Sequence, residues 1–332
     1  MRAIVTGVAG FIGSHVADRL LARGYRVLGI DDLSGGFREN VPAAVDFEPL
    51  SCNAPLDDLF KAYRPDAVFH LAAYAAEGLS HHIPHFNYQN NVLGTVNVLA
   101  ASQRAAAGHF VFTSSIAVYG HPTGGGAFRE ADACHPCDPY GIAKLACEQQ
   151  IRAAHDYFGG PTYTLFRPHN VYGPRQNIAD LYRNVVGIFM RCGLQGEPFP
   201  IFGDGSQTRS FSYITPVAEA IAAAATEPAA KNQTFNIGGD QPTSVAELAT
   251  AVAEVLGVER KIATLEPRNE VQHAHADHEK AARVFPEALG ESVELREGLQ
   301  RMAAQVRTAP IPSPTPCPAP IELPARLPPR WQ

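Results

Sequence analysis

The sequence predicts an α/β protein built on a parallel, doubly wound sheet. Short apolar runs such as Ala3-Ile-Val-Thr6 and Arg26-Val-Leu-Gly-Ile30 alternate with longer amphipathic segments, and each run has the length of a buried strand. The first run leads into a glycine-rich turn and then a helix. Strands that alternate with helices pair in parallel, because each helix returns the chain to the same edge of the sheet.

Composition narrows the class of protein. The 332 residues are 45% hydrophobic and 18% charged, values typical of a soluble globular protein. The net charge of −6 and the lack of a long basic run argue against nucleic acid as a partner. No apolar run reaches the length of a membrane span, and the first residues read as a strand rather than a signal peptide. We therefore expect a cytoplasmic protein without a membrane partner.

The elements follow one another in a regular order along the first half of the chain. Expected strands are 3–6, 26–30, 67–71, 109–113 and 163–166, and expected helices are 14–23, about 88–107, about 140–158 and, later, 245–256. We assign residues 1–170 to a nucleotide-binding domain to which later segments return. Glycines, prolines and aromatics crowd the chain after residue 171, so residues 171–307 are expected to form mainly a smaller α+β substrate lobe. The proline-rich residues 308–332 are expected to be a disordered tail.

The turn after the first strand has the pattern of a dinucleotide site. Gly7, Gly10 and Gly13 stand between a strand and a helix, where glycines permit a tight turn and close approach of a diphosphate to the helix N-terminus. The next strand ends at Asp31, whose carboxylate can accept hydrogen bonds from both hydroxyls of an adenine ribose and repels a 2′-phosphate. The pattern therefore favours NAD over NADP. Ala72 and Ala73, after the strand 67–71, are small enough for a cofactor to lie against them.

A tyrosine and a lysine one helical turn apart supply the candidate chemistry. Tyr140 and Lys144 lie on the same face of the expected helix, and Ser115 follows the strand 109–113 with a hydroxyl for the same site. A tyrosine has a pKa near ~10, so lowering it by about 3 units needs roughly 4 kcal/mol. We expect the Lys144 ammonium and an oxidised nicotinamide to lower the pKa of Tyr140 in this way.

Two other motifs are interpreted as structural. Cys134-His-Pro-Cys137 imitates a redox pair but stands in a proline-rich loop without a second cysteine pair. The histidines around residues 81–85 and 273–278 do not follow a zinc-protease pattern, so no metal is expected.

Taken together, the motifs resemble those of the extended short-chain dehydrogenase/reductases over about residues 1–305. Within that family the chain is similar to the nucleotide-sugar 4-epimerases such as UDP-galactose 4-epimerase. The matching residues are Gly7-x-x-Gly10-x-x-Gly13, Asp31, His70-Leu-Ala-Ala73, Asn90-Asn91, Ser114-Ser115-x-x-Val118-Tyr119-Gly120, Tyr140-x-x-x-Lys144, Arg167-Pro-x-Asn170-Val-Tyr-Gly-Pro174 and Gly203-Asp-Gly-x-Gln-x-Arg209.

The resemblance implies a role for each matched position on a Rossmann-type sheet. Ser115, Tyr140 and Lys144 would be catalytic. The residues implied to bind NAD are Gly7, Gly10, Phe11, Ile12, Gly13, Asp31, Asp32, Ser34, Gly35, Leu71, Ala72, Ala73, Asn90, Thr113, Tyr140, Lys144 and Pro168. Those implied to bind the nucleotide sugar are Ser115, Tyr140, His169, Asn170, Asn184, Val185, Phe202, Arg209, Arg268, Glu270 and Ala274.

The reaction that the resemblance implies is epimerisation at C4 of a nucleotide-diphosphate hexose through a transient 4-keto sugar. Tyr140 would take the proton of the 4-hydroxyl while hydride passes to NAD and returns to the other face. Ala274 matches a position that admits 2-acetamido sugars when it is small. The resemblance also implies a homodimer formed by helices that carry Val92, Val96, Leu99, Leu145 and Ile151.

Departures from the family pattern bear on the alternatives. Ile116-Ala117 stands where dehydratases have an acidic pair and 3,5-epimerases a cysteine, and Asn177 stands where uronate-specific epimerases have an arginine. A neutral hexose is therefore favoured, and the resemblance implies that it is UDP-linked. Ala75 replaces a lysine common in the cofactor site, and the adenine-contacting acid is missing around Ser51-Cys-Asn53. Another nucleotide-sugar epimerase or reductase, or a non-catalytic NAD-sensing protein, remains as an alternative.

Overall fold

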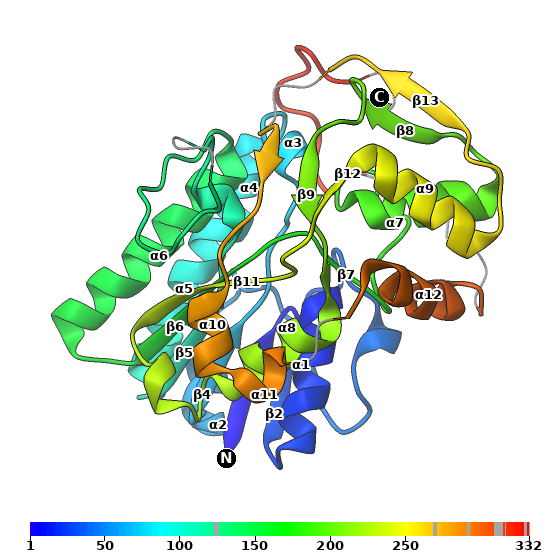
Figure 1. The fold of residues 1–332 in the computed structure, drawn as a ribbon. Helices are drawn as coiled ribbons and strands as arrows, with labels where there is room; N and C mark the ends of the chain where they lie inside the picture. Colours follow the sequence, from blue (N-terminus) through cyan, green and yellow to red (C-terminus); the bar gives the residue numbers. More distant parts are fainter. Residues whose placement is uncertain are drawn as a thin grey trace.

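The computed structural model of the chain is organised around a parallel sheet (Figure 1). It describes residues 1–122, 126–267, 271–290, 293–308, 315, 317–328 and 331. Among these residues, seven strands form the central sheet in the order β11-β6-β5-β4-β1-β2-β3, and every neighbouring pair is parallel. The strand order reverses beside β1, and in such sheets the ligand lies at the carboxyl ends of the strands next to this point. The doubly wound sheet expected from the sequence is confirmed.

The strands of the central sheet are β1 (Arg2–Thr6), β2 (Arg26–Ile30), β3 (Asp46–Glu48), β4 (Ala67–His70), β5 (His109–Thr113), β6 (Thr162–Pro168) and β11 (Gln233–Ile237). The helices that connect or cover them are α1 (Phe11–Ala22), α2 (Asp57–Tyr63), α3 (Glu77–Ser80), α4 (Pro84–Tyr88), α5 (Gly94–Arg104), α6 (Pro139–Phe158), α8 (Ile214–Ala223), α10 (Glu279–Val284) and α11 (Pro286–Leu289).

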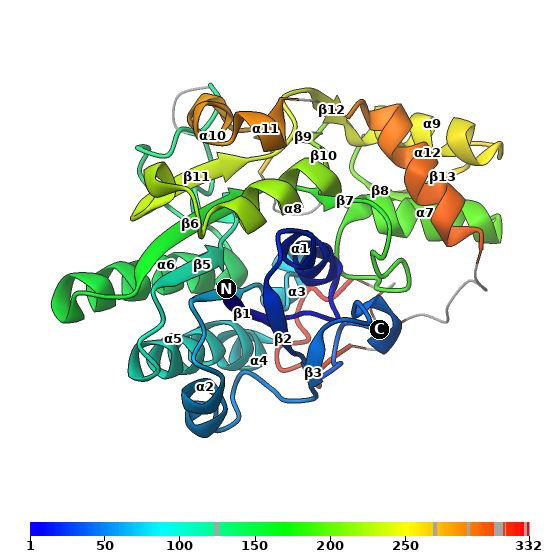
Figure 2. The same cartoon turned by 90° about the horizontal axis from the view of Figure 1, so that it is seen from below.

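Helices cover both faces of the sheet (Figure 2). One face packs against α1 and α8, which also contact each other. The other face packs against α2, α5 and α6 through side chains such as Phe60, Val98 and Ile151. Burying both faces explains why the central strands contain almost continuous apolar residues.

Two helices differ from those expected close to the cavity. The first helix begins at Phe11 rather than Ser14, so its first turn includes Gly13, the last glycine of the motif. The expected single helix of about 88–107 is divided into α4, a π-helical turn from Gln89 to Leu93, and α5. The Asn91 amide lies in this turn and bonds both the N–H and the C=O of Tyr74, at 2.9 and 3.2 Å. Such π-helical turns are frequent at functional sites.

The remaining elements lie beyond the carboxyl ends of the strands (Figure 1). They are β7 (Val171–Tyr172), α7 (Val185–Gln195), β8 (Phe199–Phe202), β9 (Thr208–Ser210), β10 (Ser212–Tyr213), β12 (Pro242–Ser244), α9 (Val245–Leu256), β13 (Ile262–Leu265), β14 (His273–Ala274) and α12 (Leu295–Val306). Helix α9 contacts both α7 and α12, and β9 pairs with both β12 and β14. These elements stand over the edge of the sheet at which the glycine turn lies.

The described part of the proline-rich tail corrects the expectation of disorder. Residues 317–328 form an irregular segment with bends and a turn, and they lie beside α3 and α4 (Figures 1 and 2). The Glu322 carboxylate accepts hydrogen bonds from the N–H groups of His85 and Phe86, at 2.9 and 3.1 Å. Trp331 is 8% exposed and packs in a cluster that includes Leu79 and Ile83. The described residues of the tail are held in place because Ile321, Leu327 and Trp331 supply apolar contacts.

Candidate active site

Helix α6, which carries Tyr140 and Lys144, is fixed at its first turn. The Asp138 carboxylate caps it by accepting a hydrogen bond from the Gly141 N–H at 2.8 Å, and Pro139 occupies the first helical position. Tyr140 and Lys144 then fall one turn apart on the buried face, with 6% and 3% of their surfaces exposed. The structure thus brings together the two residues that the spacing predicted to share a face.

Lys144 reaches the end of the neighbouring strand. Its Nζ donates a hydrogen bond to the Thr113 carbonyl oxygen at 2.8 Å and lies 5.8 Å from the centroid of the Tyr140 ring. Burial lowers the pKa of Lys144 to about 8. The Thr113 Oγ1 is buried beside this lysine and has no hydrogen-bond partner among the described residues. A ligand that offers a polar group here would satisfy it.

The expected lowering of the Tyr140 pKa is not what the surrounding groups produce. Burial raises the pKa of Tyr140, and the charge of Glu77 raises it further, while a hydrogen bond with Ser115 lowers it. Ser115 itself accepts a hydrogen bond from the Ala117 N–H at 3.1 Å and caps a short helical turn. The Lys144 ammonium is directed to the Thr113 carbonyl rather than to the phenol oxygen.

The glycine turn leaves no room for side chains. Gly7 has φ +73°, and a Cβ there would lie 2.7 Å from the Ala72 nitrogen; a Cβ at Gly13 would lie 2.0 Å from the Gly7 oxygen. Among the described residues, no side chain caps α1, whose first turn contains no acidic residue. Its first N–H groups therefore present the positive end of the helix dipole to the cavity, as a bound diphosphate requires. The local geometry fits a dinucleotide.

Asp31 stands at the end of β2 as predicted. Its carboxylate accepts hydrogen bonds from the N–H groups of Ala9 and Leu33, at 3.0 and 2.8 Å. Burial raises the pKa of Asp31, and these two hydrogen bonds oppose the rise. The carboxylate is thereby held beside the glycine turn, where a ribose would lie.

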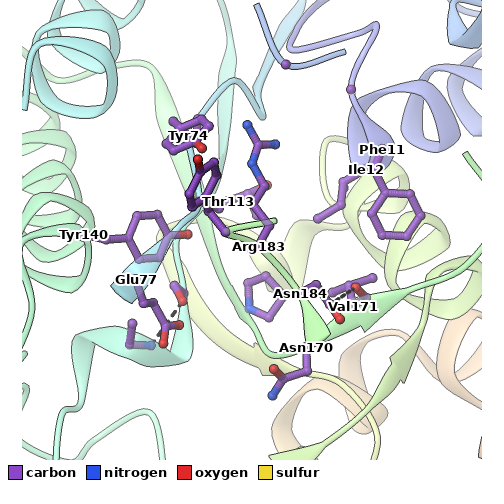
Figure 3. Close-up of a pocket in the computed structure, with 18 of the residues that line it drawn as sticks. Phe11, Ile12, Tyr74, Glu77, Thr113, Tyr140, Asn170, Val171, Arg183 and Asn184 are labelled. Atoms are coloured by element: carbon purple, nitrogen blue, oxygen red, sulfur yellow. Dashed lines mark hydrogen bonds between the residues drawn. The ribbon is translucent and has the colours of Figure 1, made fainter. Parts of the chain in front are cut away.

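One cavity of about 510 Å³ joins the candidate cofactor and substrate residues (Figure 3). The candidate cofactor residues that line it are Gly7, Gly10, Phe11, Ile12, Gly13, Asp31, Asp32, Ser34, Gly35, Leu71, Ala72, Ala73, Asn90, Thr113, Tyr140, Lys144 and Pro168. The candidate substrate residues that line it are Ser115, Tyr140, His169, Asn170, Asn184, Val185, Phe202, Arg209 and Ala274. Arg268 and Glu270, also assigned to substrate, lie outside the described residues.

Several substrate candidates have well-defined local contacts. The Asn184 side chain caps α7 by accepting from the Val186 N–H at 2.9 Å, and its Nδ2 donates to the Val171 oxygen at 2.7 Å. Arg209 pairs in register with Ala274 between β9 and β14. Asn170 adopts a left-handed φ of +41°, a conformation that asparagine tolerates better than most residues. Contacts made by neighbouring residues also hold the turn around Asn170.

Three linked side chains, those of His169, His278 and Asp240, support the turn at Asn170. The His169 Nδ1 lies 2.9 Å from the Ser210 carbonyl oxygen, its Nε2 lies 2.8 Å from the His278 Nε2, and the His278 Nδ1 lies 2.6 Å from an Asp240 carboxylate oxygen. A carbonyl only accepts, so the His169 Nδ1 donates. Burial lowers the pKa of His169 to about 3, which keeps it neutral and makes its Nε2 an acceptor. With the His169 Nε2 as acceptor, the two contacts of His278 are both satisfied when its two ring nitrogens donate, one to His169 and one to Asp240.

The sequence did not identify several residues that line the same cavity. Tyr74, Glu77, Arg183 and Trp331 all line it, and Figure 3 shows Tyr74, Glu77 and Arg183 near Tyr140. Arg183 and Trp331 come from segments without a motif. Their position at the cavity is visible only in the folded structure. Glu77 could have been noticed in the sequence, because it is a charged residue two positions after Ala75, which was matched to the cofactor site.

Within the described residues, no group of three or more His, Cys, Asp or Glu side chains could hold a metal ion. Cys134 and Cys137 are free thiols, as are the other four cysteines. In the described part of the chain, no helix is both long and apolar enough to cross a bilayer.

Comparison with known proteins identifies the family. A family model described as the NAD dependent epimerase/dehydratase family matches residues 3–238. The chain belongs to this family. It is 36% identical over 293 residues to the UDP-glucose 4-epimerase of Mycolicibacterium smegmatis, covering 86% of this chain and 92% of that protein.

Solved structures agree with the sequence comparison. The UDP-glucose 4-epimerase of Thermotoga maritima, solved with UDP-glucose, is 34% identical with a TM-score of 0.87, covering 93% of this chain and 99% of that chain. The UDP-glucose 4-epimerase of Thermus thermophilus, solved with NAD, is 31% identical with a TM-score of 0.85, covering 93% of this chain and 100% of that chain. The predicted family and NAD cofactor are confirmed, and the chain is an NAD-dependent enzyme.

Proposed function

We propose that this enzyme epimerises C4 of a UDP-linked hexose. The observation that carries the proposal is the position of Ser115, Tyr140 and Lys144 on one wall of the cavity that the glycine turn also lines. A nucleotide sugar in this cavity would be within reach of a hydroxyl, a phenol and an ammonium. The 4-epimerase relatives support the same reaction.

Each of the three residues has a separate task. Tyr140 accepts the proton of the 4-hydroxyl and returns one after the sugar has turned over. Ser115 holds that hydroxyl and the phenol in line, and Lys144 is placed by Thr113 to bind the ribose next to the nicotinamide. Bound NAD supplies hydride exchange at C4 and, when oxidised, a positive charge beside the phenol. Because burial raises the pKa of Tyr140, the phenol stays protonated until such a charge is close.

The substrate is proposed to be a neutral hexose rather than a uronic acid. Asn177 lines the cavity at the position expected for the uronate-binding arginine. Its Nδ2 donates to the Thr315 Oγ1 at 3.2 Å, and its Oδ1 accepts from the Ala179 N–H at 3.0 Å. An amide that is engaged on both sides offers no positive charge to a carboxylate.

The test is a panel of nucleotide sugars with 4-epimers resolved by chromatography. The wild-type enzyme should interconvert UDP-glucose and UDP-galactose, and UDP-glucuronate should react far more slowly. Tyr140→Phe should retain bound NAD and the wild-type melting temperature but lose turnover by about 10²-fold or more. Wild-type turnover in the Tyr140→Phe enzyme would contradict the mechanism.

We also propose that the enzyme is a homodimer in the cytoplasm. Tyr88, Leu93, Val96 and Ile142 are 37%, 57%, 37% and 43% exposed on neighbouring helices, and such an apolar surface favours self-association. Of the residues first assigned to this surface, Leu99 and Ile151 pack inside the core instead. The six free thiols support a reducing compartment. Light scattering at micromolar concentration should give twice the chain mass, and Leu93→Asp should reduce it to that of a monomer.

A further inference from the structure

Arg183 reaches into the cavity from the segment that precedes α7. Figure 3 shows its guanidinium between Tyr74 on one side and Phe11 and Ile12 on the other. The Cζ lies 4.3 Å from the centroid of the Tyr74 ring, and the Nε lies 2.9 Å from a carboxylate oxygen of Asp180. The Nε has no hydrogen-bond partner among the described residues despite this short distance, so Asp180 holds the group through charge, while the Tyr74 side chain holds it through stacking and a hydrogen bond.

The Nη edge faces the loop that follows β2. A Cβ built at Gly35 would lie only 2.8 Å from the Nη2 of Arg183. The next residue, Gly36, packs so closely on the glycine turn that a Cβ there would lie 2.5 Å from the Ala9 backbone. Gly35 therefore leaves space for Arg183 directly beside the turn that receives the cofactor.

Two positive groups thus face the same part of the cavity from opposite sides. One is the N-terminus of α1, which no described side chain caps. The other is the Arg183 guanidinium, whose planar donor pair matches two oxygens of a diphosphate. Arg209, the cation assigned to the sugar nucleotide, lies on β9 beside β14 and donates to the Thr208 and Gln272 oxygens.

We propose that Arg183 binds the diphosphate of bound NAD, opposite the N-terminus of α1. Arg183 connects the segment before α7 to the loop after β2 at Gly35. In this position it helps to retain NAD through both halves of the reaction. Ala75 stands at the position of the lysine common in the cofactor site of the family. Arg183 would supply the missing positive charge from another segment. This proposal rests on NAD binding, and it takes the cofactor rather than the sugar nucleotide as the source of the diphosphate because of the contact at Gly35.

The experiment follows the release of NAD from the purified holoenzyme by exchange with isotopically labelled NAD. Arg183→Gln should release NAD about 10- to 100-fold faster, the effect expected for losing charge-assisted hydrogen bonds. Arg183→Lys should give an intermediate rate, because it keeps the charge and loses the planar pair. UDP binding, measured by calorimetry on the same proteins, should change by less than about twofold.

Two further variants separate cofactor binding from folding. Asp180 is 4% exposed and would be left as a buried charge by Arg183→Gln, so the double variant Asp180→Asn/Arg183→Gln is the matched control. It should keep the wild-type melting temperature and still release NAD quickly. Gly35→Ala should displace the guanidinium and speed NAD release in the wild-type background, with no further effect when Arg183 is already glutamine.

The outcomes are distinct. Weaker UDP binding with unchanged NAD release would assign Arg183 to the sugar nucleotide and overturn the proposal. Unchanged NAD release and unchanged UDP binding would overturn it as well. Fast NAD release from Arg183→Gln, together with a wild-type enzyme that epimerises no sugar on the panel, would uphold the role of Arg183 and reject the proposed reaction.

Discussion

At the scale of residues, the phenol of Tyr140 depends on charges that surround it in three dimensions. Burial and the Glu77 carboxylate raise its pKa, and a hydrogen bond with Ser115 lowers it. Nearby Lys144 has its own pKa lowered to about 8 by burial and donates to a backbone carbonyl. A phenol in this environment holds its proton tightly at neutral pH. In the proposed mechanism, proton removal is therefore tied to the arrival of positive charge, which would couple the acid–base step to the oxidised cofactor.

A second residue-scale feature is the wall at Ala274, which is 8% exposed and lines the cavity. We predict that the wild-type enzyme accepts both plain and N-acetylated UDP-hexoses, because an alanine leaves space for a 2-acetamido group. Ala274→Tyr should lower kcat/KM for UDP-N-acetylglucosamine by about 10²-fold and leave UDP-glucose nearly unchanged.

The neighbouring His273 provides the control for this wall. His273 is exposed on the other side of β14 and bonds the Thr208 hydroxyl at 2.9 Å. His273→Tyr adds the same ring outside the cavity, so it should leave both substrates unaffected. Equal slowing of both sugars by Ala274→Tyr, or a wild type inactive on UDP-N-acetylglucosamine, would show that Ala274 is not the gate.

Residues in local motifs could be placed from the sequence, and residues that reach the cavity from loops could not. The four-residue interval between Tyr140 and Lys144 sets one helix face, and the glycine interval sets one turn, so both are determined locally. Arg183 enters the cavity only because the tertiary fold brings the segment 176–184 to line it. The electrostatic effect of Glu77 on Tyr140 likewise depends on packing between distant segments.

At the scale of elements, the turn after β6 is held by β10 and by the start of α10. Ser212 Oγ donates to the His169 oxygen at 2.7 Å, and the ring of His169 bonds Ser210 and His278. The sequence showed His278 only as one of three scattered histidines. Its role follows from topology, because β9, β10 and α10 meet behind Asn170.

This arrangement predicts the protonation of two histidines. At pH 7, nitrogen NMR should show His278 with protons on both ring nitrogens and His169 with one, on Nδ1. The hydrogen bond from His278 lowers the pKa of Asp240, so its carboxylate stays charged well below pH 7. Asp240→Asn removes the counter-charge, and a neutral His278 can then donate to only one of its two partners.

The loss of that hydrogen bond should loosen the Asn170 turn. We expect Asp240→Asn to raise the KM for the nucleotide sugar about fivefold with little change in kcat, as the loss of about 1 kcal/mol implies. Asp277→Asn, at a neighbouring acid that pairs with Arg129, serves as the control. A singly protonated His278 in the wild-type enzyme would contradict this reading of the three distances.

At the scale of the whole molecule, the C-terminal segment connects the cavity to the catalytic helix. The tail makes hydrogen bonds with His82. The His82 carbonyl accepts from the N–H groups of Glu322 and Leu323, and the His82 Nδ1 donates to the Leu323 oxygen at 2.7 Å. Helix α4 is in turn joined to α6, because the Asn87 amide donates to the Pro139 oxygen at 2.9 Å. Composition shows the prolines of the tail but not its hydrogen-bond partners, which lie more than 200 residues away in the sequence.

Removal of residues 309–332 should therefore affect stability and substrate binding together. The deletion uncovers Leu79 and Ile83 and removes Trp331 from its contacts with His82 and Tyr182, so we expect the melting temperature to fall by several degrees. The KM for the nucleotide sugar should rise, because Trp331 lines the cavity, while bound NAD is retained through the glycine turn. Trp331→Ala should reproduce the rise in KM with a smaller loss of stability, and Trp331→Phe should reproduce little of either. A truncated enzyme with wild-type KM and melting temperature would show that the tail has no part in the site.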